Sequence, residues 1–178
     1  TTESITMNDP PELSGTAIIS QPISCFGSCD GAVDFIVDNI ETGVPPYTYS
    51  LNGGVFQNSN SFTSLCGATN YTLTVNDANG CSYSSNVFLP QPTQIQFNLS
   101  TSNFNGFGVS CFGSFDGSIS ITSTSGGAAN YQYSNDGGNT FSSFPTFSNL
   151  VAGSYTVTVT DGSGCFQDTI VDLIEPGQ

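Results

Sequence analysis

The sequence predicts an all-β protein built from two tandem immunoglobulin-like or fibronectin-III-like β-sandwich modules. Apolar and polar side chains alternate from Tyr155 to Thr160 and from Tyr71 to Val75, the pattern of a strand with one buried face. Gly, Asn, Asp and Pro residues separate such segments roughly every 8 to 12 residues, a spacing typical of sandwiches. No part of the chain has the periodicity of a helix.

One sequence pattern occurs twice in the chain. Cys25 to Ser28 returns as Cys111 to Ser114, and Asp77 to Cys81 returns as Asp161 to Cys165. A fixed period of this kind indicates repeated structural modules, so the repeat sets the domain organisation.

The junctions between repeats are also recognisable. Val87 to Pro92 and Val171 to Pro176 each begin with an aliphatic residue and carry a proline five residues later, and Ile5 to Pro10 has the same spacing. We therefore expect the parent protein to continue beyond both ends of this chain. The predicted organisation is the tail of a preceding module at 1–10, a first repeat at 11–91 and a second repeat at 92–178.

Composition excludes several function classes. The 178 residues include no Lys, Arg or His and 14 Asp plus Glu, giving a formal charge of −14. Nucleic acids and anionic membrane surfaces bind through cationic side chains, so both partners are disfavoured. No stretch approaches the ~18 apolar residues of a membrane span, and we predict no membrane insertion.

Enzymatic chemistry is also disfavoured, because acid-base and nucleophilic catalysis usually recruit His, Lys or Arg. Two carboxylates suffice for glycoside hydrolysis, and Asp30 and Asp77 recur as Asp116 and Asp161. Asp30 and Asp77 lie in turn sequences, where an Asp side chain hydrogen-bonds its own backbone. We predict a structural role for them and no enzyme activity.

No cofactor is predicted, although calcium stays an alternative because oxygen ligands are plentiful. Asp34 and Asp38 would share one strand face, but the second repeat has Ser120 and Thr124 there. A repeated calcium site is therefore not expected.

Two local motifs support the fold. Ser134 to Phe141 has the composition of a tight hairpin turn around Asp136-Gly137. Leu150 to Tyr155, with Leu65 to Tyr71 as its counterpart, resembles the corner of immunoglobulin-like domains in which a Tyr hydroxyl bonds back to the backbone. An ordinary core Tyr is the alternative at both positions.

The six cysteines indicate disulfides and an oxidising compartment, since the chain has no His to complete zinc sites. The second repeat holds only the counterparts of Cys25 and Cys81, whereas Cys29 and Cys66 align with Phe115 and approximately Val151. Cysteines that are gained or lost together are expected to bond. The predicted pairs are Cys25 with Cys81, Cys111 with Cys165, and Cys29 with Cys66.

Two alternatives to this pairing remain open. All six cysteines could be free buried thiols, or a bond such as Cys81 with Cys111 could join the two modules.

The order of these motifs resembles the SprB-type repeat of giant cell-surface gliding adhesins. The matching elements in the first repeat are Cys25-Phe26-Gly27, Asp30-Gly31, Pro45 to Ser50, the Gly-Tyr corner and Asp77 to Cys81. All but the Pro-Pro of the third element recur in the second repeat.

The resemblance implies export by the type IX secretion system and an extracellular, outer-membrane-associated location. It also implies a role in surface attachment and gliding. The resemblance further implies O-glycosylation at Asp-Ser/Thr-aliphatic sites, as in gliding bacteria that carry such adhesins. Asp168-Thr169-Ile170 makes Thr169 a candidate acceptor.

The predicted function is a structural and adhesive repeat segment of a long secreted filament. The alternative is a module that binds glycans or surfaces directly through exposed polar and aromatic faces. Expected partners are neighbouring repeats of the same chain, an extracellular surface or glycan, and the gliding and secretion machinery through other parts of the parent.

Overall fold

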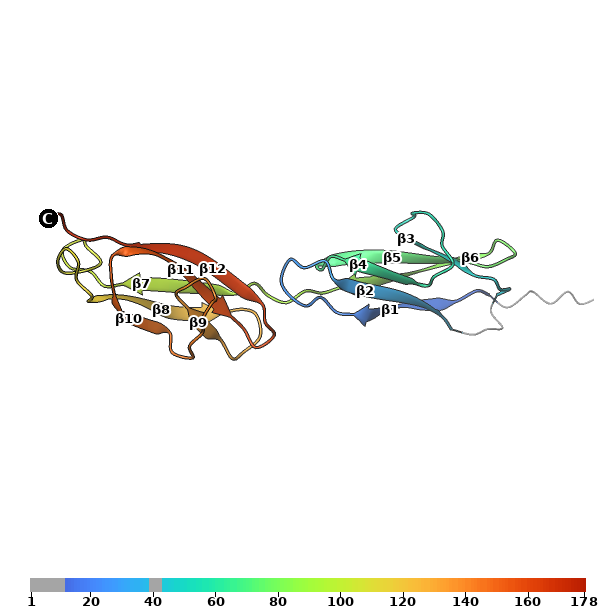
Figure 1. Cartoon of the computed structure of the whole chain (residues 1–178). Helices are drawn as coiled ribbons and strands as arrows, with labels where there is room; N and C mark the ends of the chain where they lie inside the picture. Colours follow the sequence, from blue (N-terminus) through green and yellow to red (C-terminus); the bar gives the residue numbers. More distant parts are fainter. Residues whose placement is uncertain (1–11, 39–42) are drawn as a thin grey trace, which may run out of the picture. The chain divides into compact units, whose positions relative to one another are not determined.

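A computed structural model describes residues 12–38 and 43–178. The predicted tail of a preceding module at 1–10 lies outside the described residues. The described residues form twelve strands and no helix (Figure 1). They divide into two compact units, with unit 1 ending at Gln91 and unit 2 running from Pro92 to Gln178. The predicted all-β sandwich fold is confirmed.

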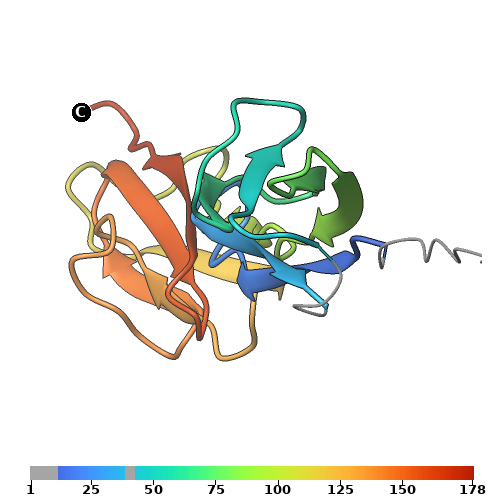
Figure 2. The same ribbon diagram turned by 90° about the vertical axis from the view of Figure 1, so that its right-hand side faces the viewer.

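Unit 1 consists of two three-stranded antiparallel sheets, seen as separate layers in Figure 2. The first has the order β1-β2-β4 and the second the order β3-β5-β6. This connectivity is that of an immunoglobulin-like sandwich, in which strand B pairs with strand E. Here β2 corresponds to strand B and β4 to strand E, and β3 lies in the other sheet. The bounds are β1 (Gly15–Gln21), β2 (Gly31–Val37), β3 (Thr48–Leu51), β4 (Ser61–Leu65), β5 (Thr69–Asn76) and β6 (Ser82–Leu89).

Unit 2 repeats the arrangement, with sheets ordered β7-β8-β10 and β9-β11-β12. The same pairs of strands are neighbours in both units, as the repeated sequence requires. The bounds are β7 (Gln96–Thr101), β8 (Gly117–Ser125), β9 (Gln132–Ser134), β10 (Thr146–Leu150), β11 (Gly153–Thr160) and β12 (Phe166–Leu173).

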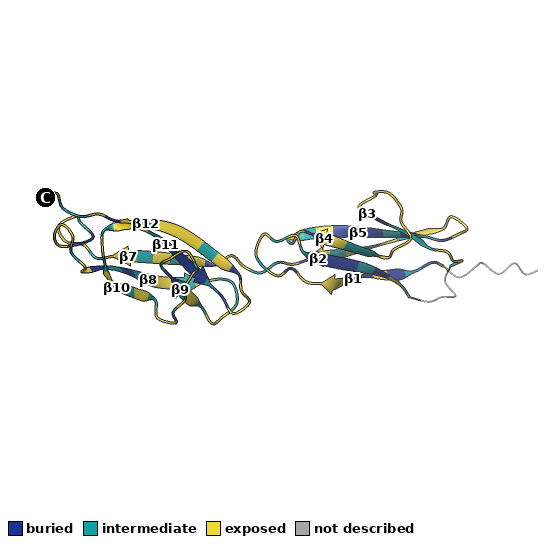
Figure 3. Cartoon of the chain, viewed as in Figure 1, coloured by how far each residue is buried: buried dark blue, intermediate teal, exposed yellow. Residues whose placement is uncertain are grey.

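The core of each unit lies between its two sheets (Figure 3). In unit 1 the alternation predicted for β5 is confirmed, because Tyr71, Leu73 and Val75 are buried. In unit 2, Val157 and Val159 of β11 have no exposed surface. Burial of one face of each sheet is the main source of stability for such a sandwich.

The chain enters each unit at one end, here called the proximal end, and leaves at the other, the distal end. In unit 1 the β5–β6 turn lies at the proximal end, because Ala78 N–H donates to the carbonyl of Val44 in the loop that follows β2. The β1–β2 loop lies at the distal end of unit 1 (Figure 1). There, Gly27 N–H donates to Gln91 Oε1 at 3.0 Å. In unit 2 the distal tie recurs, from Gly113 N–H to Glu175 Oε2 at 2.8 Å.

The Tyr corner is present in both units. The Tyr155 hydroxyl donates to the carbonyl of Val151, and the Tyr71 hydroxyl donates to the carbonyl of Cys66, each at 2.9 Å. These bonds join the start of β5 and of β11 to the segment that precedes it. The corner interpretation is therefore confirmed over that of an ordinary core Tyr.

Candidate functional site

The cysteines are the chemically distinctive side chains of this chain. The predicted bond between Cys29 and Cys66 is present and closes a sequence separation of 37 residues. It joins the β1–β2 loop to the end of β4 at the distal end of unit 1. In unit 2 the corresponding positions carry Phe115 and Val151, whose side chains are 70% and 38% exposed.

The other two predicted pairs, Cys25 with Cys81 and Cys111 with Cys165, are wrong. Cys81 and Cys111 are free and exposed, whereas Cys25 and Cys165 are disulfide-bonded.

The physical reason for this error is the placement of the two loops in the sandwich. The pairing Cys25–Cys81 assumed that both residues lie at one end of the unit. Cys25 lies in the distal β1–β2 loop and Cys81 in the proximal β5–β6 turn, so the length of β6 separates them. Eight strand residues span about 24 Å, whereas a disulfide needs Cα atoms within about 7 Å.

The proximal turn of unit 1 is organised by one carboxylate. Asp77 Oδ1 accepts hydrogen bonds from the N–H groups of Asn79 at 2.9 Å and Cys81 at 2.8 Å, and Asp77 Oδ2 accepts from Val44 N–H at 3.1 Å. Three donors from two loops therefore converge on a single side chain, which ties the β5–β6 turn to the loop before β3.

The proximal turn of unit 2 has the same geometry. Asp161 Oδ1 accepts from the N–H groups of Ser163 and Cys165, both at 2.9 Å, and Asp161 Oδ2 accepts from Ala128 N–H at 2.8 Å. Burial raises the pKa of both Asp carboxyls, but the converging backbone N–H groups outweigh it and hold each pKa below its ordinary value of 3.8.

This geometry supports the structural interpretation of the repeated Asp residues. Asp30 accepts from Ser24 N–H at 3.2 Å within the distal β1–β2 loop, and Asp116 does the same with Ser110 at 3.0 Å. Asp30 and Asp77 therefore lie at opposite ends of unit 1. Paired glycosidase carboxylates lie about 5 to 9.5 Å apart, so these two do not form that kind of site.

The hairpin after β9 is the turn that its sequence predicts. Ser134 Oγ donates to Asp136 Oδ1 at 2.6 Å and accepts from Gly138 N–H at 2.9 Å, while Thr140 Oγ1 donates to Asp136 Oδ2 at 2.6 Å. Hydrogen bonds from the Ser134 and Thr140 hydroxyls lower the Asp136 pKa to about 2. Every donor belongs to the turn itself, so the motif is a folding element.

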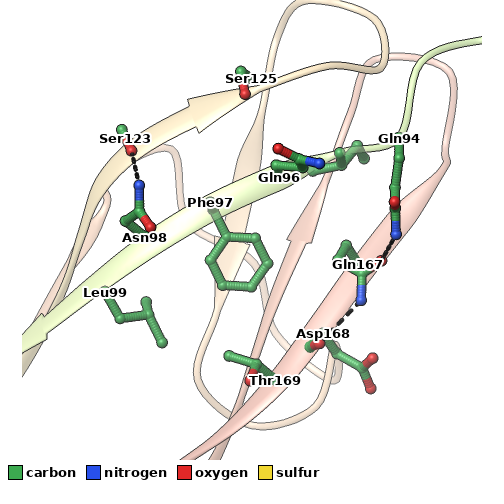
Figure 4. Close-up of a pocket in the computed structure, with 11 residues that line it drawn as sticks. Gln94, Gln96, Phe97, Asn98, Leu99, Ser123, Ser125, Gln167, Asp168 and Thr169 are labelled. Carbon is green, nitrogen blue, oxygen red and sulfur yellow. Dashed lines mark hydrogen bonds between the residues drawn. The ribbon is translucent and has the colours of Figure 1, made fainter.

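Unit 2 contains a groove of about 580 Å³ between its edge strands β7 and β12, shown in Figure 4. Amide and hydroxyl side chains form its walls. Gln94 Nε2 donates to Gln167 Oε1 at 3.1 Å, and Asn98 Nδ2 donates to Ser123 Oγ at 2.9 Å. The Phe97 ring lies between the two strands (Figure 4). Such a surface can hydrogen-bond a polar ligand and stack against its apolar face.

In unit 1 the corresponding edge strands, β1 and β6, lie next to each other and are hydrogen-bonded. Ala17 N–H of β1 donates to Ser85 Oγ of β6 at 3.1 Å. The strand register makes Leu99 the counterpart of Ala17, and Thr169 the counterpart of Ser85. Both Leu99 and Thr169 line the groove, so larger side chains at these positions accompany the separation of the strands.

Sequence reasoning found Thr169 only as a candidate modification site and missed the rest of the groove. Thr169 is exposed on β12 and lines the groove beside Asp168. Comparing the two repeats at Ala17 and Leu99 was the available signal.

In residues 12–38 and 43–178 no cluster of three metal-ligating side chains occurs. The same residues include no helix long and apolar enough to cross a membrane.

Comparison with known families finds the SprB repeat in both units. The matched regions are residues 17–56 of unit 1 and 109–140 of unit 2. The first match covers most of β1 with β2 and β3, and the second covers β8 and β9. No curated protein matches the chain. The resemblance seen in the motifs is confirmed, and it points to a repeat segment of a cell-surface adhesin.

Removing the Cys29–Cys66 bond should destabilise unit 1 selectively. The chain-entropy model for a closed loop of 37 residues gives a loss of about 4 kcal/mol for Cys29→Ser/Cys66→Ser. Hydrogen exchange followed by mass spectrometry should show faster exchange of β5 amides, with β11 in unit 2 as the internal control. Equal acceleration in both units would contradict a local role for the bond.

Asp161 should contribute stability that depends on pH. Because its pKa is lower in the folded state, the contribution is present above the unfolded value of about 4 and is lost as pH falls through the folded value. Asp161→Asn should accelerate exchange of the β11–β12 turn about tenfold near neutral pH, through loss of a charged hydrogen bond. The difference from the unmodified chain should shrink in acid.

The matched control for this experiment is Asp168→Asn, which removes an exposed carboxylate of β12. Similar acceleration by both variants would show that net charge, rather than the turn, is responsible.

Proposed function

Because each unit contains a match to the SprB repeat, we propose that the chain is a structural and adhesive repeat segment of a long secreted cell-surface adhesin filament. The filament serves surface attachment and gliding motility, and the chain is not an enzyme. Its location is extracellular and outer-membrane-associated after type IX secretion.

The proposal depends on the contacts that the two units share. The repeated contacts are the Asp-centred proximal turn, the Tyr corner and the distal tie between the β1–β2 loop and the segment after the last strand. In each of them a side chain hydrogen-bonds the backbone and so holds two chain segments together. The groove between β7 and β12 is not among these repeated contacts, because the corresponding strands of unit 1, β1 and β6, are bonded to each other. Contacts that hold the scaffold together in both units are what a stalk requires.

The direction of the strands also suits a load-bearing role. In unit 1, β1 and β6 both run from the proximal to the distal end, and Ala17 N–H donates to Ser85 Oγ across them. Tension applied through the two ends of the unit therefore shears adjacent strands along their length. Shear loads many contacts at once, whereas peeling from one end would load them one after another.

The proposed partners follow from this role and from the charge. They are neighbouring repeats of the same chain, an extracellular surface or glycan as the target, and the secretion and gliding machinery, which other parts of the parent engage. Nucleic-acid binding is not expected because the chain has no side-chain cation. Membrane insertion is not expected because no stretch of the sequence approaches the ~18 apolar residues of a span.

A second function, direct glycan binding, is favoured by the groove in Figure 4. Gln94, Asn98 and Gln167 offer amide donors and acceptors beside the Phe97 ring. The formal charge of −14 disfavours acidic polysaccharides, so the expected ligand is a neutral glycan. No cofactor is required for either function.

Single-molecule pulling through the two termini of a Cys25→Ser/Cys165→Ser variant, in which Cys29–Cys66 is the remaining disulfide, tests the structural role. Two discrete unfolding events are expected, one for each unit. The event from unit 1 should be shorter by about 130 Å, since the bond locks 37 residues at about 3.5 Å each. Reductant or Cys29→Ser/Cys66→Ser should restore that length. Gradual extension without discrete events would reject a load-bearing stalk.

A glycan array tests the second function. The intact chain should bind neutral oligosaccharides, and Gln94→Ala/Gln167→Ala should weaken binding about tenfold through loss of groove hydrogen bonds. Asn70→Ala, at an exposed position of β5 in unit 1, is the matched control. Binding that survives the groove substitutions would place the ligand elsewhere.

A further inference from the structure

Of the two free thiols in the described residues, one lies at the proximal end of its unit and the other at the distal end of its unit. Cys81 is in the proximal turn of unit 1, and Cys111 is in the distal loop of unit 2, before β8. Both are exposed. A thiol at each position can therefore be reached by another protein without unfolding either unit.

Each thiol is presented on a turn that hydrogen bonds hold in place. Cys81 N–H donates to Asp77 Oδ1 at 2.8 Å. The carbonyl of Cys111 accepts from Ser114 N–H at 3.1 Å, and the neighbouring Gly113 N–H donates to Glu175. Phe112, beside Cys111, is 53% exposed, which adds an apolar side chain to the distal surface.

The repeat supplies an internal comparison for both positions. Cys165 is the counterpart of Cys81 and occupies the same Asp-centred turn, with its N–H 2.9 Å from Asp161 Oδ1. Cys25 is the counterpart of Cys111. Both counterparts are disulfide-bonded. The proximal position is thus disulfide-bonded as Cys165 and free as Cys81, and the distal position is disulfide-bonded as Cys25 and free as Cys111, although the local turn is the same.

We propose that Cys111 and Cys81 are the two halves of a head-to-tail disulfide between successive repeat modules. The distal cysteine of one module bonds the proximal cysteine of the module that follows it. Cys111 thereby bonds a cysteine of the following module, and Cys81 bonds a cysteine of the preceding module. A second copy of this chain can take the place of either neighbouring module. The inference rests on the proposed role as a segment of a repeat filament.

The bond forms by oxidation of two thiols, for which the oxidant is a low-molecular-weight disulfide such as oxidised glutathione. The Cys111 thiolate attacks this disulfide, forms a mixed disulfide and releases one thiol. The Cys81 thiolate then attacks the Cys111 sulfur and releases the second thiol. Two electrons pass to the oxidant, and the two cysteine protons end on the two released thiols.

The consequence for a filament is a second covalent link at each junction, in addition to the peptide bond. A junction that is tied at two points resists bending and twisting more than one joined by a single chain.

The test uses two single variants, Cys81→Ser and Cys111→Ser, each of which keeps one of these two thiols. One variant is labelled with ¹⁵N, the two are mixed, and oxidised glutathione is added. Non-reducing chymotryptic mapping by mass spectrometry then identifies the cross-linked peptides. We expect Cys111–Cys81 mixed dimers about tenfold above their statistical proportion, reflecting a preferred orientation of the two ends. The intact chain should give a ladder of oligomers that reductant reverses.

Mixed dimers and homodimers in statistical proportion would overturn the proposal, as would thiols that stop as glutathione adducts. Cys81→Ser/Cys111→Ser should stay monomeric and is the control. Pulling experiments on that double variant in the Cys25→Ser/Cys165→Ser background should still give two unfolding events, so failure of the junction bond is distinguishable from failure of the stalk role.

Discussion

The register of the last hairpin in each unit, set by one carboxylate, is the constraint on which the rest of the sandwich depends. Asp161 binds the backbone of its own turn and that of the loop before β9, and β11 and β12 then pair over eight residues without a break. Because side chains alternate along a strand, a shift of one residue would expose Val157 and Val159 and bury Thr156. The turn therefore determines which side chains of β11 face the core, and it also sets the position of Cys165.

The absence of cations explains why the carboxylates are used in this way. With no Lys, Arg or His, the chain has no side-chain cation with which to pair its 14 Asp and Glu. Backbone N–H groups and hydroxyls take the place of cations at Asp30, Asp77, Asp116, Asp136 and Asp161. Such bonds are short and local, so they hold turns and leave the strand pairing to the backbone.

The two units also show how a repeat diverges without losing its fold. The Ser134 hydroxyl is the centre of the β9 hairpin, but the hydroxyl of its counterpart Ser50 has no hydrogen-bond partner within the described residues. Unit 1 has Asn52 near the position of Asp136, and its side chain accepts from Thr72 N–H instead. A buried hydroxyl without a partner costs about 1 to 3 kcal/mol, and the remaining contacts of unit 1 offset this cost.

The sequence by itself determined the local features: strand alternation, the repeat, the Tyr corner, the Asp turns and the Cys29–Cys66 pair. Each depends on residues close in sequence or on comparison of the two copies. Only the tertiary structure decided which ends of the strands meet. That placement separated Cys25 from Cys81 by the length of β6, and the spacing of β7 from β12 opened the groove beside Thr169. Both outcomes depend on packing between sheets, which alternation within a strand does not encode.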